Sequence, residues 1–181
     1  MEAQKNILIT GLPGSGKTTL VIKLAEALKD LQPAGCYTAE ILKEGVRQGF
    51  ELVSLDGTKA VLSHIDIRSI FRVGRYGVDI KGFDAFLDSL ELCCREAGLI
   101  IIDEIGKMES HSDRFKALVR ALLNSETPVL ATIALKGSGF IDEIRNRADI
   151  RLIELNEANR NFLIKDISEE IRNLVQRKER R

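Results

Sequence analysis

The sequence is poor in the residues that build disulfide frameworks and structural metal sites. It has 3 cysteines and 2 histidines among 181 residues. The cysteine total is odd and two of the three, Cys93 and Cys94, are adjacent, which is a poor basis for a disulfide framework. Neither His64 nor His111 lies near a pair of cysteines at zinc-ligand spacing, so we expect no structural zinc site.

Long apolar runs and an excess of one charge sign are also lacking. No run approaches the roughly 20 residues of a spanning helix, and no charged-then-apolar signal segment opens the chain, so we expect a cytoplasmic location without membrane contact. Lys plus Arg and Asp plus Glu each number 27, so we do not expect nucleic acid as a partner. The length and the 44% apolar content indicate a single domain spanning residues 1–181, and we favour a monomer.

What the chain does contain is the phosphate-binding motif G-x-x-x-x-G-K-[ST], at residues 11–18. An apolar run at 6–10 predicts a buried strand before it, and Leu20, Leu24 and Leu28 predict a helix after it. In that context the glycines let backbone amides approach phosphate oxygens, and the helix N-terminus adds free N–H groups. Lys17 can bridge the β- and γ-phosphates, and the Thr18 hydroxyl can bind Mg²⁺. The candidate nucleotide-binding residues are Gly11, Leu12, Pro13, Gly14, Ser15, Gly16, Lys17, Thr18 and Thr19.

The remainder alternates strand and helix patterns, apart from one segment. Further buried strands are predicted at 99–102, 129–133 and 150–155, and helices at 83–97, 115–123, 140–147 and 162–175. Cys94 shares the apolar face of the 83–97 helix and is predicted to be a core residue. Within 36–65, three short strand-like runs joined by tight-turn signals predict antiparallel hairpins. We therefore predict an α/β fold in three layers, a mostly parallel sheet with helices on both faces, plus an antiparallel hairpin insertion at about 36–65.

Asp103 and Glu104 follow the apolar strand 99–102, at the sheet edge where the phosphate loop also lies. Phosphate-loop enzymes hold Mg²⁺ with the loop Ser/Thr and a carboxylate at this place, so we predict Thr18 and Asp103 as the metal ligands. Glu104 can orient and deprotonate the water aimed at the γ-phosphorus. We predict Lys17 and Glu104 as the catalytic residues.

Residues 66–81 interleave arginines with aromatic residues. Arg72 and Arg75 either lie on a solvated loop or contact a phosphate group, and we keep both as nucleotide-site candidates. Thr132 could sense the γ-phosphate or be a buried strand threonine, and Lys107 could neutralise phosphate charge or face water. Arg145, Arg147 and Arg160 could close over a nucleotide, although surface ion pairs are the default for the first two.

A guanine-specific reading is the one alternative that the motifs suggest. Asp103 to Gly106 fits D-x-x-G of switch GTPases, which makes Gly106 a further nucleotide-site candidate. Residues 146–149 resemble N-K-x-D but lack the lysine and end a predicted helix, so we do not expect base-specific recognition.

Taken together, these segments resemble a family of small nucleoside-triphosphatases that includes thermostable enzymes and the human cancer-related nucleoside-triphosphatase. The matching segments are TGLPGSGKTT (10–19), YTAE (37–40), RQGF (47–50), RVGRYGV (72–78), IDEIGKME (102–109), EIRNR (143–147) and NRN (159–161). The resemblance covers nearly the whole chain. It implies a RecA-like core with an added antiparallel region and Mg²⁺-dependent hydrolysis of several nucleoside triphosphates. It places phosphate binding on residues 11–18 and metal and water roles on Asp103 and Glu104.

Three functions remain open on these grounds. The first is slow hydrolysis of ATP, GTP, CTP and UTP to the diphosphate and phosphate. The second is a nucleotide or nucleoside kinase, which would need an acceptor pocket and an arginine-rich lid. The third is a nucleotide-gated switch associated with RNA or protein, with hydrolysis that only resets it. Measuring phosphate release with and without candidate acceptors distinguishes the hydrolase from the kinase. Strong stimulation of hydrolysis by RNA or a protein would favour the switch.

Overall fold

The computed structural model describes residues 4–93 and 96–179, and within these ranges nine strands form one sheet. The strands are β1 (Asn6–Thr10), β2 (Ala34–Lys43), β3 (Val46–Ser54), β4 (Lys59–His64), β5 (Arg72–Val73), β6 (Tyr76–Val78), β7 (Ile100–Ile105), β8 (Val129–Ile133) and β9 (Ile150–Glu154). The α-helices are α1 (Lys17–Ala27), α2 (Ile80–Leu90), α3 (Asp113–Asn124), α4 (Phe140–Arg145) and α5 (Leu163–Glu179). Two short 3₁₀ helices are η1 (Lys29–Leu31) and η2 (Glu109–His111).

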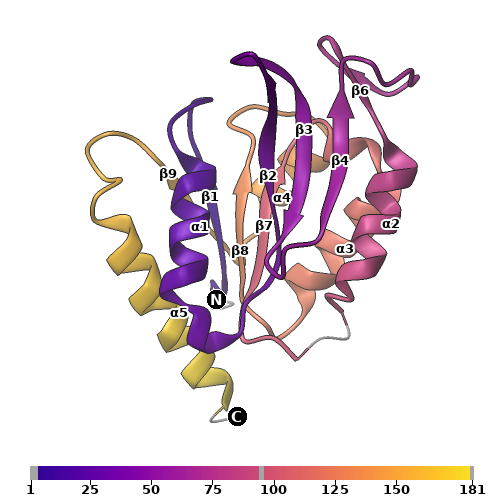
Figure 1. The fold of residues 1–181 in the computed structure, drawn as a ribbon. Helices are drawn as coiled ribbons and strands as arrows, with labels where there is room; N and C mark the ends of the chain where they lie inside the picture. Colours follow the sequence, from indigo (N-terminus) through magenta and orange to yellow (C-terminus); the bar gives the residue numbers. More distant parts are fainter. Residues whose placement is uncertain (1–3, 94–95, 180–181) are drawn as a thin grey trace.

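The strands are ordered β5-β6-β4-β3-β2-β7-β8-β1-β9 (Figure 1). Strands β2, β7, β8, β1 and β9 pair in parallel. Strands β3, β4, β6 and β5 continue the same sheet with antiparallel pairs. The predicted α/β fold with a mostly parallel central sheet is therefore confirmed. The antiparallel pairing extends further than predicted, from residue 65 to Val78.

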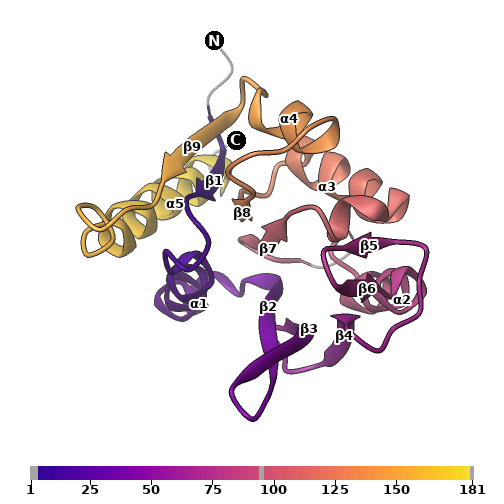
Figure 2. The same ribbon diagram turned by 90° about the horizontal axis from the view of Figure 1, so that it is seen from above.

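Helices cover both faces of the sheet, α1 and α5 on one and α2, α3 and α4 on the other (Figure 2). Successive residues of β7 show why four apolar residues in a row are needed. Ile100 and Ile102 belong to the apolar cluster under α2 and α3, whereas Ile101 belongs to the cluster under α1 and α5. No helix within the described residues has the length and apolarity needed to cross a membrane.

Helix α2 differs from its predicted range of 83–97 at both ends. It begins at Ile80, where the Asp79 carboxylate accepts a hydrogen bond from the Gly82 N–H at 3.0 Å. It ends at Leu90, because Glu91 adopts a left-handed conformation with φ of 50°. Leu92 and Ala97 remain buried without being helical, so burial alone explains their apolar character. Cys94 lies outside the described residues.

Strand β2 joins the parallel core through Gly35, which pairs with Ile101 of β7. A Cβ atom at this position would lie 1.8 Å from the Ile101 carbonyl oxygen, and the φ angle of Gly35 is +140°. Only glycine combines that conformation with that approach of the two backbones.

Candidate active site

The sheet order brings three strand ends together at one edge. Strand β8 lies between β1 and β7, with Thr132 beside Ile9 in the register of β1 and β8. The phosphate loop follows β1, and Asp103 and Glu104 occupy the carboxyl-terminal part of β7. Segments that are nearly one hundred residues apart in sequence therefore form one site, as expected for the carboxyl ends of parallel strands.

The loop between β1 and α1 has the backbone that the motif predicts. Gly14 and Gly16 have φ angles of 77° and 94°, and a Cβ atom at Gly11 would lie 2.8 Å from the Leu155 carbonyl oxygen. Lys17 folds back over the loop, and its Nζ donates to the Gly11 carbonyl at 3.1 Å. The Ser15 hydroxyl is buried without a hydrogen-bond partner. A lysine held over a loop of glycine amides, beside an unsatisfied hydroxyl, is suited to a polyphosphate chain.

Asp103 is the centre of a cluster of hydroxyl groups. The Thr18 hydroxyl donates to Asp103 Oδ2 at 2.8 Å, and the Thr132 hydroxyl donates to Oδ1 at 2.6 Å. The backbone N–H and the hydroxyl of Thr38 both lie 3.4 Å from Oδ2. Asp103 is 1% exposed and has no ion-pair partner among the described residues.

The donor set of this cluster fits a hard divalent cation. No group of three or more His, Cys, Asp or Glu side chains suited to a metal occurs in the described part of the chain, so the protein offers no complete cage. Mg²⁺ needs only one or two protein oxygen ligands, because it keeps several waters and binds substrate phosphates. The Thr18 hydroxyl and the Asp103 carboxylate, already in contact, meet that requirement.

Two further carboxyl groups lie beside Asp103, those of Glu104 and Glu109. Burial raises the pKa of Glu104, Lys17 opposes the increase, and Asp103 adds to it. Burial also raises the pKa of Glu109 to about 8, with the charges of Glu104 and Asp103 contributing. A Cβ atom at Gly106 would lie 2.8 Å from Glu109 Oε2 and 3.2 Å from Glu104 Oε1. Gly106 therefore lies between the two carboxyl groups and makes room for both.

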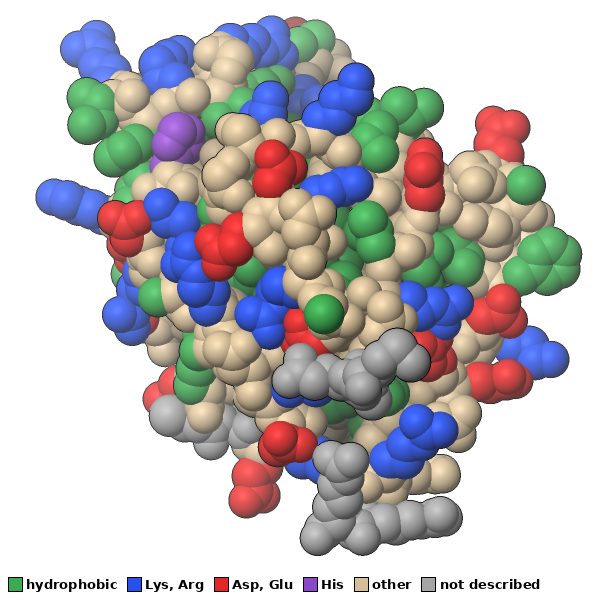
Figure 3. Space-filling view, turned by 180° about the vertical axis from the view of Figure 1, so that it is seen from behind, with side chains coloured by type: hydrophobic (Ala, Val, Ile, Leu, Met, Phe, Trp, Pro, Cys, Tyr) green, Lys and Arg blue, Asp and Glu red, His purple; other side chains and the backbone are tan. Residues whose placement is uncertain are grey.

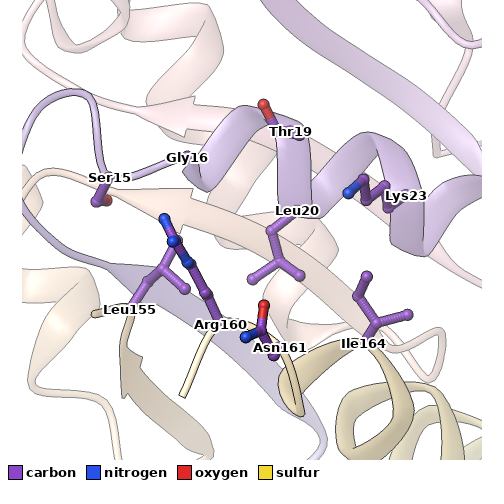
Figure 4. Close-up of a pocket in the computed structure, with 9 residues that line it drawn as sticks. All are labelled: Ser15, Gly16, Thr19, Leu20, Lys23, Leu155, Arg160, Asn161 and Ile164. Atoms are coloured by element: carbon purple, nitrogen blue, oxygen red, sulfur yellow. The ribbon is translucent and has the colours of Figure 1, made fainter. Parts of the chain in front are cut away.

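A cleft of about 320 Å³ adjoins the phosphate loop on the α1 side (Figure 4). Its walls are Ser15, Gly16, Thr19, Leu20, Lys23, Leu155, Arg160, Asn161 and Ile164. Arg160 extends from the segment between β9 and α5 toward Ser15 (Figure 4). Of the predicted loop residues, Ser15, Gly16 and Thr19 line this cleft.

Most of the chain matches known nucleoside-triphosphatases. Residues 6–168 match the protein family described as NTPase. The nucleoside-triphosphatase THEP1 of Thermotoga sp. (strain RQ2) is 45% identical over 162 residues, which cover 89% of this chain and 92% of that protein. The human cancer-related nucleoside-triphosphatase is 37% identical over 179 residues, and the alignment covers 90% of this chain and 94% of that protein. The crystal structure of THEP1 from Aquifex aeolicus superimposes with a TM-score of 0.84 at 37% identity, covering 92% of this chain and 98% of that one.

The chain belongs to this NTPase family. The resemblance noted in the sequence is thereby confirmed, and with it the phosphate-loop NTPase fold and the enzyme class.

The arginines of this NTPase lie in three different places. Arg72 lines a second cleft that contains no phosphate-loop residue, and Arg75 donates to the Arg47 carbonyl and stacks on the Tyr76 ring at 5.2 Å. Arg145 donates to the Thr10 hydroxyl at 3.3 Å, directly before the phosphate loop.

Arg147 is placed away from the site. It binds both carboxylate oxygens of Asp149 at 2.9 Å, and Asp149 in turn binds Asn6 at the amino end of β1. The tetrapeptide 146–149 therefore lies at the opposite end of the strand from the phosphate loop.

Thr38 and Glu109 also lie at the site, although no sequence motif identifies them. Thr38 lies 65 positions before Asp103, in the middle of β2, a strand of mixed polar and apolar residues. Glu109 belongs to η2, five residues after Glu104. Both fall inside segments that carry the family resemblance, which is the only signal in the sequence that marks them.

Proposed function

We propose that this NTPase hydrolyses several nucleoside triphosphates, among them ATP, GTP, CTP and UTP, to the diphosphate and phosphate with Mg²⁺. The contact of the Thr18 hydroxyl with the Asp103 carboxylate, beside Lys17 and Glu104, is the observation that carries the proposal. It unites phosphate binding, metal binding and a general base at one edge of the sheet.

The phosphate chain would lie along the amides of residues 11–16, with Lys17 neutralising its charge. The buried Ser15 hydroxyl, which has no partner, is a further donor to a phosphate oxygen. Thr18 and Asp103 would hold Mg²⁺, which when bound neutralises charge on the β- and γ-phosphate oxygens. Thr132 and Thr38 orient the Asp103 carboxylate through their hydroxyl groups.

Glu104 would take the proton from the attacking water. The water oxygen forms a bond to the γ-phosphorus, the bridging bond to the β-phosphate oxygen breaks, and the diphosphate leaves. A carboxyl group whose pKa is raised by burial is a stronger base than an exposed one, which suits this task. We expect slow turnover, because an arginine that stabilises the transition state is worth about 10³–10⁵ in rate and none here contacts Asp103 or Glu104 in the described residues.

The cleft beside α1 supports weak discrimination between bases. Its lining next to the loop offers Leu155, Arg160 and Asn161, and the base would contact side chains of an irregular segment rather than a buried set of hydrogen-bonding groups. The tetrapeptide that resembles a guanine-reading motif lies at the far end of β1, held by Asn6.

Phosphate release from each of the four triphosphates, with Mg²⁺ and with EDTA, tests the proposal. We expect release from all four within about tenfold in kcat/KM, and none with EDTA. Release from a single triphosphate, or release that persists with EDTA, contradicts it. A diphosphate panel serves as the control for cleavage at the γ-phosphate.

A further inference from the structure

A second cleft opens at the same edge of the sheet as the phosphate loop. It has a volume of about 610 Å³ and is bounded by three segments: residues 72–74 of the β5–β6 hairpin, residues 107–111 after β7, and residues 136–141 between β8 and α4. We propose that this cleft, which we call the basic cleft, binds the phosphate group of a small molecule. Binding here needs no nucleotide, so the inference does not depend on the proposed function.

The charge of the basic cleft favours an anion. Arg72, Lys107 and Lys136 line it together with His111, and no acidic residue in the described part of the chain does. Figure 3 shows Lys and Arg side chains gathered along the upper edge of the face covered by α3 and α4. The whole chain has a formal net charge of zero, so this concentration of one sign is local. A concave surface that carries charges of one sign concentrates counter-ions.

Among the described residues, Arg72, Lys107 and Lys136 have no acidic partner. Across residues 4–93 and 96–179, Lys107 and Lys136 form no ion pair and no side-chain hydrogen bond, and Arg72 donates only to the Arg75 carbonyl, at 2.8 Å. Other exposed cations of the described chain do have acidic partners, such as Arg120 with Glu143. Three cations that line one cleft without an acidic partner repel each other unless an anion joins them.

The cleft has the size and the donors for a phosphorylated small molecule. Its volume lies in the usual range of small-molecule sites, about 300–1,000 Å³. Arg72 offers a planar guanidinium, which matches phosphate oxygens in pairs, and the two lysines offer point charges. Ser138, Gly137 and Gly74 also belong to the lining. A bounded cleft is better suited to a small ligand than to an extended nucleic-acid backbone.

The basic cleft is distinct from the nucleotide site, although the two are close in sequence. None of residues 11–19 lines it, and neither Asp103 nor Glu104 does. Lys107 follows Glu104 by three positions, and Lys136 follows the strand that carries Thr132. The phosphate group bound in the basic cleft could therefore be product phosphate that leaves the nucleotide site, or the phosphate group of a separate phosphomonoester.

The test is a titration of the full chain with the phosphate loop saturated by Mg²⁺ and a non-hydrolysable ATP analogue. One arm uses inorganic phosphate and the other uses adenosine monophosphate and glucose 6-phosphate, each up to about 10 mM. Calorimetry gives the affinity, and the amide NMR signals of Gly74 and Gly137 report the place. We expect saturable shifts at both glycines. Binding of inorganic phosphate alone identifies product phosphate, and tighter binding of an ester identifies a phosphomonoester.

Charge variants decide whether the basic cleft is responsible. The double variant Lys107→Gln with Lys136→Gln should bind about tenfold or more weakly per charge removed, since each charged hydrogen bond contributes at least that much. Lys165→Gln, an exposed lysine on α5, is the matched control and should bind as the wild type does. No saturable shift with any probe, or an unchanged affinity in the double variant, overturns the proposal. The titration is repeated without nucleotide in the Lys17→Ala variant. Phosphate binding to the basic cleft should persist there, so its failure can be distinguished from a failure of nucleotide binding.

Discussion

Replacing Glu104 with glutamine should separate nucleotide binding from hydrolysis. Glutamine keeps the shape of the side chain but cannot accept the proton of the attacking water. Burial already disfavours the charged form of Glu104, so the neutral variant should fold at least as stably as the wild type. The loss of a negative charge beside the γ-phosphate should leave nucleotide affinity equal or tighter.

The size of the effect follows from the role of the side chain. General-base catalysis contributes about 10²–10⁴ in rate. No other carboxyl group in the cluster is free to replace Glu104. Asp103 is held by Thr18 and Thr132, and burial raises the pKa of Glu109 to about 8, which keeps that group mostly protonated at neutral pH. We therefore expect Glu104→Gln to lower phosphate release by at least about 10².

Single-turnover phosphate release and calorimetric nucleotide binding, both with Mg²⁺, measure the two quantities. Glu109→Gln is the matched control, because it changes the neighbouring buried carboxyl group on the other side of Gly106. That variant should keep release within about tenfold of the wild type. If Glu104→Gln releases phosphate at more than a tenth of the wild-type rate, or if both variants lose the same amount, the water is activated by another group and the reasoning fails.

Three other variants test the phosphate loop and the fold. Lys17→Ala should abolish both binding and turnover, and normal binding in calorimetry would contradict the role of that lysine. Gly35→Ala should lower the free energy of unfolding by about 3 kcal/mol, because its Cβ would meet the Ile101 carbonyl; an unchanged urea midpoint would refute this. Asp149→Asn should cost about 1–3 kcal/mol at pH 7 by weakening the bonds to Arg147 and Asn6. Burial opposes the lowered pKa of Asp149 but Arg147 outweighs it, so this stabilisation is present above about pH 4 and lost as pH falls further; an equal difference in urea unfolding at pH 7 and pH 3 would contradict it.

The elements around the phosphate loop could be predicted because their patterns are local. Strand β1 is buried along its whole length, its residues 7–9 are all apolar, and the glycines after it mark the turn. The helix predicted at 115–123 is found as α3, which Ser112 caps by accepting a hydrogen bond from the Phe115 N–H at 2.9 Å. The position of the site, at the edge where β1 and β7 end, could be predicted because ligands of parallel α/β sheets bind at the carboxyl ends of the strands.

What the sequence could not show depends on contacts between distant segments. The end of α2 was misplaced because apolar spacing continues to Ala97, and spacing does not distinguish a buried loop from a helix. Arg147 forms an ion pair with nearby Asp149, the kind of contact that the sequence made the default, but its place at the amino end of β1 depends on the distant bond between Asp149 and Asn6. The basic cleft needs three segments to meet, and no single segment carries its pattern.

The antiparallel strands belong to the candidate site rather than lying beside it. Strand β2 pairs with β7 on one side and β3 on the other, and its Thr38 reaches the Asp103 carboxylate. At the far end of the same extension, Arg72 of β5 forms one wall of the basic cleft. A shift of these strands would therefore change the surroundings of Asp103 and the shape of the basic cleft together. An extension that served only to enlarge the core would need neither contact.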